Sequence, residues 1–190
     1  MKLKALTLVP LAAAALALTG CSSNDDTAKD GGAANTACAT VPQELAGKPT
    51  WQVRGTQGCA VFTVTDDGAN KAPSVLLTTP FKVDETEVKT LIPGTGATVT
   101  DASTVDVFYE GVNGSTGQVF DSAYQRGASA QFPASGVVEG FRKALVGQRV
   151  GSTVAVVIPS AEGYPQGTGD GSINAGDTIV FALKIVGAQG

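Results

Sequence analysis

The chain has 190 residues, of which 43% are hydrophobic and 24 are glycine, and its formal net charge is −4. It contains no histidine, which excludes a Ser-His-Asp triad, a Cys-His pair and a histidine-bound zinc ion. The acidic balance argues against nucleic acid as a partner, because binding to phosphates requires a basic face.

Residues 1–20 have the pattern of an export signal. Lys2 and Lys4 precede an apolar run from Leu6 to Leu18, which is too short to span a bilayer comfortably. The run ends in Leu18-Thr19-Gly20-Cys21, which resembles the bacterial lipobox, in which the cysteine is acylated. The alternative is an ordinary secretory signal followed by a chance cysteine. We expect an extracytoplasmic lipoprotein that is anchored to the cell membrane through Cys21.

The next segment, residues 21–37, is small and polar after its cysteine. Such a composition cannot bury enough apolar surface to offset the entropy of ordering, so it predicts a flexible tether. Two further cysteines follow, Cys38 and Cys59. Export places them in an oxidising compartment, where a disulfide is the default and two unpaired thiols are the alternative.

Residues 38–80 read as a small N-terminal extension made of strands. Strand patterns occur at 51–53, at 60–64 and from Pro73 to Leu77, and Asp66-Asp67-Gly68 is a turn signal. This stretch has no combination of residues that suggests catalysis, and its sequence does not indicate its purpose.

Residues 81–190 form the globular domain in our prediction. Alternation or β-branched runs predict about five strands, and the only convincing helical pattern is short and stops before Gly147. We therefore expect an α+β fold, in which an antiparallel β-sheet wraps around one short α-helix. The predicted strands are 87–92, 104–112, 118–120, 151–158 and 178–186; the helix is 139–146 and a long loop covers 159–176.

The stretch from Val105 to Leu145 is the most informative part of this domain. Its aromatic residues and one carboxylate, Asp121, fall where the chain changes direction. This arrangement suits a small apolar pocket lined by turns better than a metal or phosphate site.

Five motifs in this order resemble the FKBP-type peptidyl-prolyl cis-trans isomerases, and the chain as a whole is similar to the bacterial lipoprotein members of that family. The likeness covers about 110 residues, from Glu87 to Val186. The motifs are FYEG, VFDSAYQRG, GVVEGFRKALVGQRVG, VVIPSAEGY and DTIVFALKIV.

The resemblance implies a hydrophobic pocket that receives a proline ring. It places Phe141 on the pocket floor, Asp121 as the pocket carboxylate and Arg126 as its partner. It also gives Tyr164 as the loop tyrosine that reaches the substrate carbonyl, and Ile173 as the apolar loop residue beyond it. The implied walls are Tyr109, Phe120, Phe132, Val137, Val138 and Phe181.

Taken singly, these residues have simpler interpretations. Each phenylalanine fits a core position, Tyr109 fits an amphipathic core residue, and Asp121 fits a turn cap. Only their joint order supports a site.

Four departures from the family pattern bear on substrate preference and loop rigidity. Phe141 stands where many members have tryptophan, and Ala130 stands where some have another aromatic residue. Pro165 follows Tyr164 where glycine is usual, and Asn174-Ala175-Gly176 replaces a frequent double proline.

The implied function is peptidyl-prolyl cis-trans isomerisation of exported, proline-containing polypeptides by a monomer. Such an enzyme needs no cofactor and no metal, so the lack of histidine is compatible with it. One alternative is a non-catalytic binding or chaperone lipoprotein with the same fold. A solute-binding lipoprotein is a third possibility, but the domain is too small for two lobes around a hinge.

Overall fold

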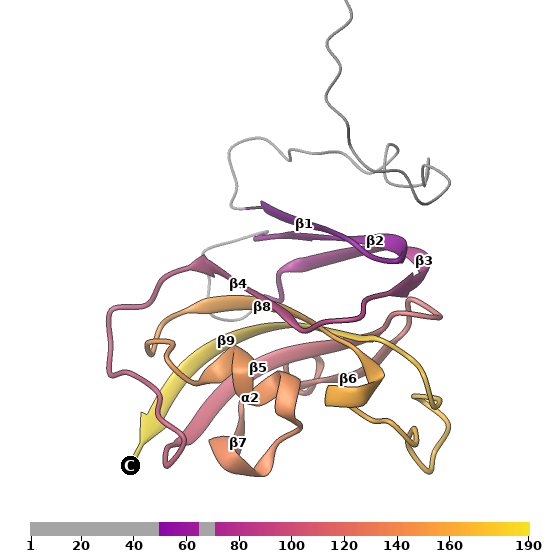
Figure 1. Ribbon diagram of the computed structural model, residues 1–190. Helices are drawn as coiled ribbons and strands as arrows, with labels where there is room; N and C mark the ends of the chain where they lie inside the picture. The colour runs from indigo at the N-terminus through magenta and orange to yellow at the C-terminus, as the bar shows by residue number, and fades with distance from the viewer. Residues whose placement is uncertain (1–49, 65–70) are drawn as a thin grey trace, which may run out of the picture. The chain divides into compact units, whose positions relative to one another are not determined.

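The computed structural model describes residues 50–64 and 71–190. Its strands form two antiparallel sheets (Figure 1). Sheet A has the order β1-β2-β3, and sheet B has the order β4-β8-β9-β5-β6, with β7 also paired to β5. The strands are β1 (Thr50–Arg54), β2 (Gln57–Thr63), β3 (Ser74–Lys82), β4 (Glu87–Ile92), β5 (Thr104–Asn113), β6 (Val119–Ser122), β7 (Ala130–Pro133), β8 (Thr153–Ile158) and β9 (Ile179–Gln189).

Helical elements are few and short in the part of the chain that the structure describes. The longest is α2 (Glu139–Leu145), and a single turn, α1 (Ala123–Arg126), follows β6 directly. The described residues also form two short 3-10 helices, η2 (Ala134–Gly136) and η3 (Ser160–Glu162). The α+β prediction is therefore confirmed: an antiparallel sheet with α2 packed on one face.

The two long apolar strands of sheet B are buried on both faces. In β8, Val154 and Val156 face α2, whereas Ala155 and Val157 face sheet A. β9 alternates in the same way, with Phe181 toward α2 and its neighbours toward sheet A. Figure 1 shows this layering, with β1–β3 above sheet B and α2 below it. Continuous apolar runs are what strands covered on both sides require.

Sheet A supplies the second layer. Its inward residues Val53, Phe62 and Phe81 pack against Val112 and Val180 of sheet B, and all five are buried. Trp51 stacks on Phe62 with ring centroids 5.2 Å apart. The N-terminal extension thus has a structural purpose that its sequence did not indicate, because it covers apolar surface that sheet B would otherwise expose to water.

The helix α2 lies close to β8 because Gly140 has no side chain. A Cβ atom at this position would lie 2.4 Å from Cγ2 of Ile158. The close approach brings Phe141, the next residue, against the centre of the sheet. Phe141, Ala144 and Leu145 are buried in this core.

Two elements differ from the sequence prediction. β7 was missed, so residues 81–190 contain six strands instead of about five. α1, a single turn, was also missed, whereas the predicted short helix is present as α2. Ser122 caps α1 by accepting a hydrogen bond from the backbone N–H of Gln125, and Gly127 ends it at φ 69°.

The predicted boundary between residues 80 and 81 falls inside β3, which runs without interruption from Ser74 to Lys82. The predicted signal peptide, Cys21, the tether, Cys38 and the Asp66-Asp67-Gly68 turn lie outside the described residues. Within residues 50–64 and 71–190, no helix is long and apolar enough to cross a membrane.

Candidate active site

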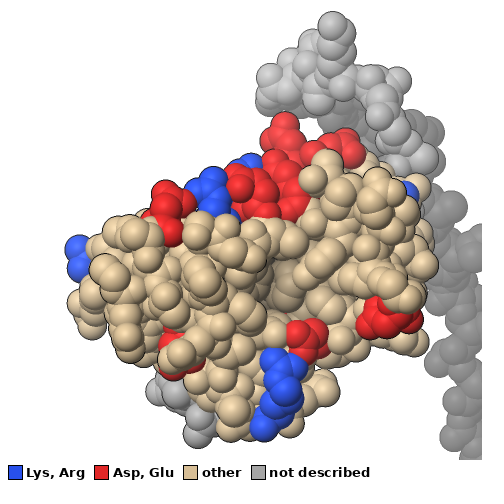
Figure 2. Space-filling model, turned by 90° about the horizontal axis from the view of Figure 1, so that it is seen from below, with Lys and Arg blue, Asp and Glu red and all other residues tan. Residues whose placement is uncertain are grey.

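A cavity of about 390 Å³ opens between the concave face of sheet B, α2 and the loop after β8. This volume lies within the range of sites for small molecules or single side chains. Figure 2, a view from the side of α2 and β7, shows a hollowed face surrounded mainly by uncharged residues. The lining residues are Tyr109, Phe120, Asp121, Phe132, Gly136, Val137, Val138, Phe141, Tyr164 and Phe181.

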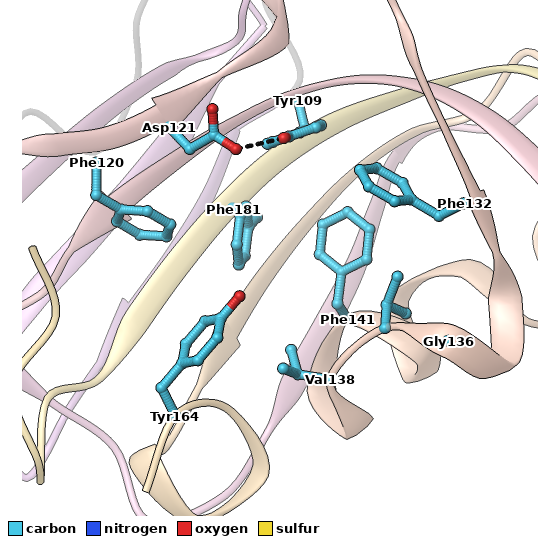
Figure 3. A pocket seen from close by; sticks show the side chains of 10 residues that line it. Tyr109, Phe120, Asp121, Phe132, Gly136, Val138, Phe141, Tyr164 and Phe181 are labelled. Atoms are coloured by element: carbon cyan, nitrogen blue, oxygen red, sulfur yellow. Dashed lines mark hydrogen bonds between the residues drawn. The ribbon is translucent and has the colours of Figure 1, made fainter. Parts of the chain in front are cut away.

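The base of the cavity is a cluster of edge-to-face aromatic rings. Phe141 and Phe181 lie 4.9 Å apart, and Tyr109 is 6.0 Å from Phe141, measured between ring centroids. Phe132 and Phe120 extend the cluster to either side, as Figure 3 shows. T-shaped contacts of this kind favour one arrangement of the rings. The apolar surface at the base is therefore preformed.

Each ring comes from a different element, so the tertiary fold assembles the cluster. Tyr109 is on β5, Phe120 on β6, Phe132 on β7, Phe141 on α2 and Phe181 on β9. Inward-facing positions alternate along β5 and β9, which points the two strand residues into the same space.

Gly111 of β5 leaves room for two of these rings. A Cβ atom there would lie 2.6 Å from both Cζ of Phe120 and Cε1 of Phe181. The glycine thus leaves space for the edges of the Phe120 and Phe181 rings next to the strand.

The polar end of the cavity is a triad of Tyr109, Asp121 and Arg126. The Tyr109 hydroxyl donates to one carboxylate oxygen of Asp121, and Arg126 pairs with the other. Arg126 also donates from Nη2 to the Tyr109 hydroxyl at 3.0 Å, and its Cζ lies 5.6 Å from the centre of that ring. Figure 3 marks the Tyr109–Asp121 hydrogen bond. The triad fixes the carboxylate at the rim.

These contacts set the protonation states. Burial raises the pKa of Tyr109, and its hydrogen bond to Asp121 raises it further. Burial also acts to raise the pKa of Asp121, but the hydrogen bonds from Tyr109 and Arg126 outweigh this effect and hold it below its ordinary value. At neutral pH the phenol is therefore protonated and the carboxylate is ionised.

Tyr164 lies on the other side of the cavity, in the loop after η3. Its hydroxyl points into the space between the aromatic rings (Figure 3). Val137 and Val138, just before α2, complete the wall next to it. A ligand in the cavity would meet apolar surface on most sides, the Tyr109–Asp121 pair at one edge and the Tyr164 hydroxyl at another.

Nine of the ten residues that the resemblance placed in the pocket line this cavity. The exception is Ile173, which is not among the lining residues and is only 2% exposed, packed in the core beneath the loop. Gly136 lines the cavity although it was not predicted, because it contributes backbone. Arg126 reaches the site only through Tyr109 and Asp121.

Comparisons of the sequence with known proteins point to one family. A sequence model described as FKBP-type peptidyl-prolyl cis-trans isomerase matches residues 96–186. The chain is 34% identical over 102 residues to a probable FK506-binding protein of Corynebacterium glutamicum, which covers 53% of this chain and 85% of that protein. It is 31% identical over 121 residues to the outer membrane protein MIP of Legionella longbeachae, which covers 64% of this chain and 50% of that protein.

A solved structure of an isomerase also resembles this chain. The crystal structure of a peptidyl-prolyl cis-trans isomerase from Pseudomonas syringae matches with a TM-score of 0.51 and 28% sequence identity, covering 56% of this chain and 77% of that one. This match places the fold among small isomerases with an antiparallel sheet. The chain belongs to the FKBP-type peptidyl-prolyl cis-trans isomerase family. Its activity is the cis-trans isomerisation of peptide bonds that precede proline.

Proposed function

We propose that the cavity binds the proline ring of exported polypeptides and accelerates rotation about the preceding peptide bond. The observation that carries this proposal is the cluster of Phe141, Phe181 and Tyr109, which leaves an apolar space of about 390 Å³ bordered by Asp121 and Tyr164. In this proposal the rings hold the pyrrolidine, and the two polar groups orient the peptide on either side of it.

The chemistry of the rotation explains why such a cavity suffices. A planar amide is stabilised by resonance that separates charge, and the barrier to rotation is about 18–20 kcal/mol. Twisting the bond removes that charge separation, so an apolar surrounding disfavours the planar ground state relative to the twisted transition state. The aromatic walls would also keep water away from the carbonyl oxygen. Hydrogen bonds from water to that oxygen stabilise the planar amide, so their loss favours the twisted one.

The test compares exchange rates of a short Leu-Pro peptide with the full chain in mild detergent and with two variants. Phe141→Ala removes the floor of the cavity, and we expect kcat/KM to fall by at least about tenfold, equivalent to about 1.4 kcal/mol of transition-state stabilisation. Tyr164→Phe removes only the hydroxyl, and we expect a smaller loss.

Two matched controls, one on β5 and one on α1, lie outside the cavity. Phe108 and Tyr124 form a ring pair with centroids 5.3 Å apart and do not line the cavity. Phe108→Ala and Tyr124→Phe repeat the two chemical changes outside the site, so exchange rates should stay near those of the parent. Unchanged turnover in Phe141→Ala would refute the proposed binding mode.

We also propose that the protein works outside the cytoplasm as a lipoprotein attached through Cys21. Three features of the sequence support this: the basic start, the apolar run and the Leu-Thr-Gly-Cys ending of residues 1–21. One relative is named an outer membrane protein. Residues 22–37 would then act as a polar spacer between the lipid and the isomerase.

The N-terminal extension would be closed by a bridge between Cys38 and Cys59. Cys59 is buried in β2 and disulfide-bonded, and Cys38 is the one other cysteine that lipidation of Cys21 leaves available. The bridge would close a loop of about twenty residues, which stabilises the folded state by about 3 kcal/mol in the loop-entropy model.

We propose that the protein acts as a monomer on proline-containing clients near the membrane.

A further inference from the structure

A buried carboxylate joins the two segments that carry the polar edges of the pocket. Asp177 lies two residues before the start of β9 and is 7% exposed. On one side it contacts the turn between β5 and β6, the hairpin that presents Asp121. On the other side it contacts the end of the loop that carries Tyr164. Asp177 does not line the cavity, so it would not touch a bound ligand directly.

The donors to Asp177 come from both segments. Oδ1 accepts from the Ser115 hydroxyl at 2.5 Å, and Oδ2 accepts from Nδ2 of Asn113 at 2.9 Å. Oδ2 also accepts from the backbone N–H of Asn174 at 2.8 Å. Nδ2 of Asn113 reaches the loop a second time by donating to the carbonyl oxygen of Ser172 at 3.0 Å.

A short chain of hydrogen bonds leads from this junction to Tyr164. The backbone N–H of Gly176 donates to the Ser160 hydroxyl at 3.1 Å, and that hydroxyl donates to the carbonyl oxygen of Tyr164 at 3.2 Å. The backbone N–H of Gly167 donates to the same carbonyl at 3.0 Å. The backbone of Tyr164 is therefore held by the turn that Asp177 organises.

We propose that Asp177, with Asn113, is a positioning residue that holds the Tyr164 loop against the β5–β6 hairpin and so fixes the width of the pocket mouth. This rests on the proposed binding of proline in the pocket. A fixed mouth keeps the Tyr164 hydroxyl at one distance from the peptide that crosses it, which lowers the entropy cost of binding.

The chemistry of the junction requires a carboxylate at this position. Burial acts to raise the pKa of Asp177, but the hydrogen bonds from Ser115, Asn174 and Asn113 hold it below its ordinary value. An ionised carboxylate only accepts, which matches a surrounding of donors. An asparagine of the same size would point its NH₂ group at one or more of these donors.

The test measures KM and kcat for a proline peptide, together with hydrogen exchange of the Gly167 and Gly176 amides, in the full chain in detergent. For Asp177→Asn we expect KM to rise about fivefold or more with kcat nearly unchanged, and faster exchange at both amides. Ser115→Ala removes one donor, so the same changes should appear at smaller size. That milder variant keeps the proposal testable if Asp177→Asn folds poorly.

Two further variants distinguish positioning from general damage. Asn113→Asp alone places two carboxylates together and should raise KM. The double variant Asn113→Asp with Asp177→Asn exchanges the amide and the carboxylate, which restores a donor–acceptor pair and should lower KM part of the way back to the parent value. Asp170→Asn changes a carboxylate of the same loop that bonds only to Thr168 and Ser172 within it, so KM should stay at the parent value.

The outcomes separate this inference from the proposed function. If the parent chain binds proline peptides and folded Asp177→Asn keeps the parent KM and exchange rates, Asp177 is not a positioning residue. If the parent chain fails to bind proline peptides in the cavity, the proposed function fails, while the exchange rates still decide whether Asp177 holds the loop.

Discussion

At the scale of single residues, the pocket depends on where side chains are absent as much as on where they are present. Gly111 shows this, because the space that its missing Cβ would fill is occupied by the edges of Phe120 and Phe181. Gly111→Ala should therefore push both rings into the cavity. We expect a rise in KM for proline peptides and a loss of about 1–3 kcal/mol in the free energy of unfolding, as for other overpacked cores.

Peptide exchange kinetics and urea unfolding would check this prediction. Gly136→Ala is the matched control, since a Cβ there would have no neighbour closer than 3.6 Å. It should leave stability nearly unchanged. A Gly111→Ala variant with the parent KM would show that the two rings shift away from the cavity at little cost.

The sequence predicted most of the pocket lining, and the two differences, at Ile173 and Gly136, have physical reasons. The aromatic residues follow motifs of fixed order, so their positions in the fold follow from the family resemblance. Ile173 lies in a loop of small polar residues, where the path of the backbone decides whether the side chain points to the pocket or the core. The structure turns it into the core, where it is 2% exposed. Gly136 was missed because a residue without a side chain gives no signal of lining a cavity.

At the scale of secondary-structure elements, the apolar character of β8 and β9 predicted burial but not the layer that buries them. Strand alternation predicted the two faces of β5, since Val105, Val107 and Tyr109 are buried and their neighbours are partly exposed. Prediction of β7 failed because the strand has only four residues, too few for its alternation to stand out, and two of them are a glutamine and a proline. Pro80 also argues against a strand, yet β3 continues through it, because β3 is at the edge of sheet A.

The second layer leads to a prediction about stability. Phe62 of β2 is fully buried between the two sheets and does not line the pocket. Phe62→Ala should lower the free energy of unfolding by about 3–5 kcal/mol, as expected for a large cavity in a core. KM of the folded protein should stay unchanged.

Urea unfolding followed by circular dichroism would measure the effect. Leu76→Ala on neighbouring β3 serves as the control, because Leu76 is 43% exposed and its truncation should cost little. If Phe62→Ala were no more destabilising than Leu76→Ala, sheet A would be an accessory to the isomerase domain instead of half of its core.

At the scale of the whole molecule, the proposed lipid anchor determines where the pocket can work. A spacer of residues 22–37 spans about 53–58 Å when fully extended, because each residue contributes about 3.3–3.6 Å. The enzyme would then meet its clients close to the membrane surface, at a high local concentration.

Cys21→Ser removes the acylation site and should release the protein from the membrane without changing its kcat/KM in solution. Detergent phase partition of cells that express each form would measure the release, and mass spectrometry of the parent chain should find a lipid-modified N-terminal cysteine. A parent protein that partitions into the aqueous phase, with no acyl group on Cys21, would mean that residues 1–20 serve for export alone and that the isomerase diffuses freely after cleavage.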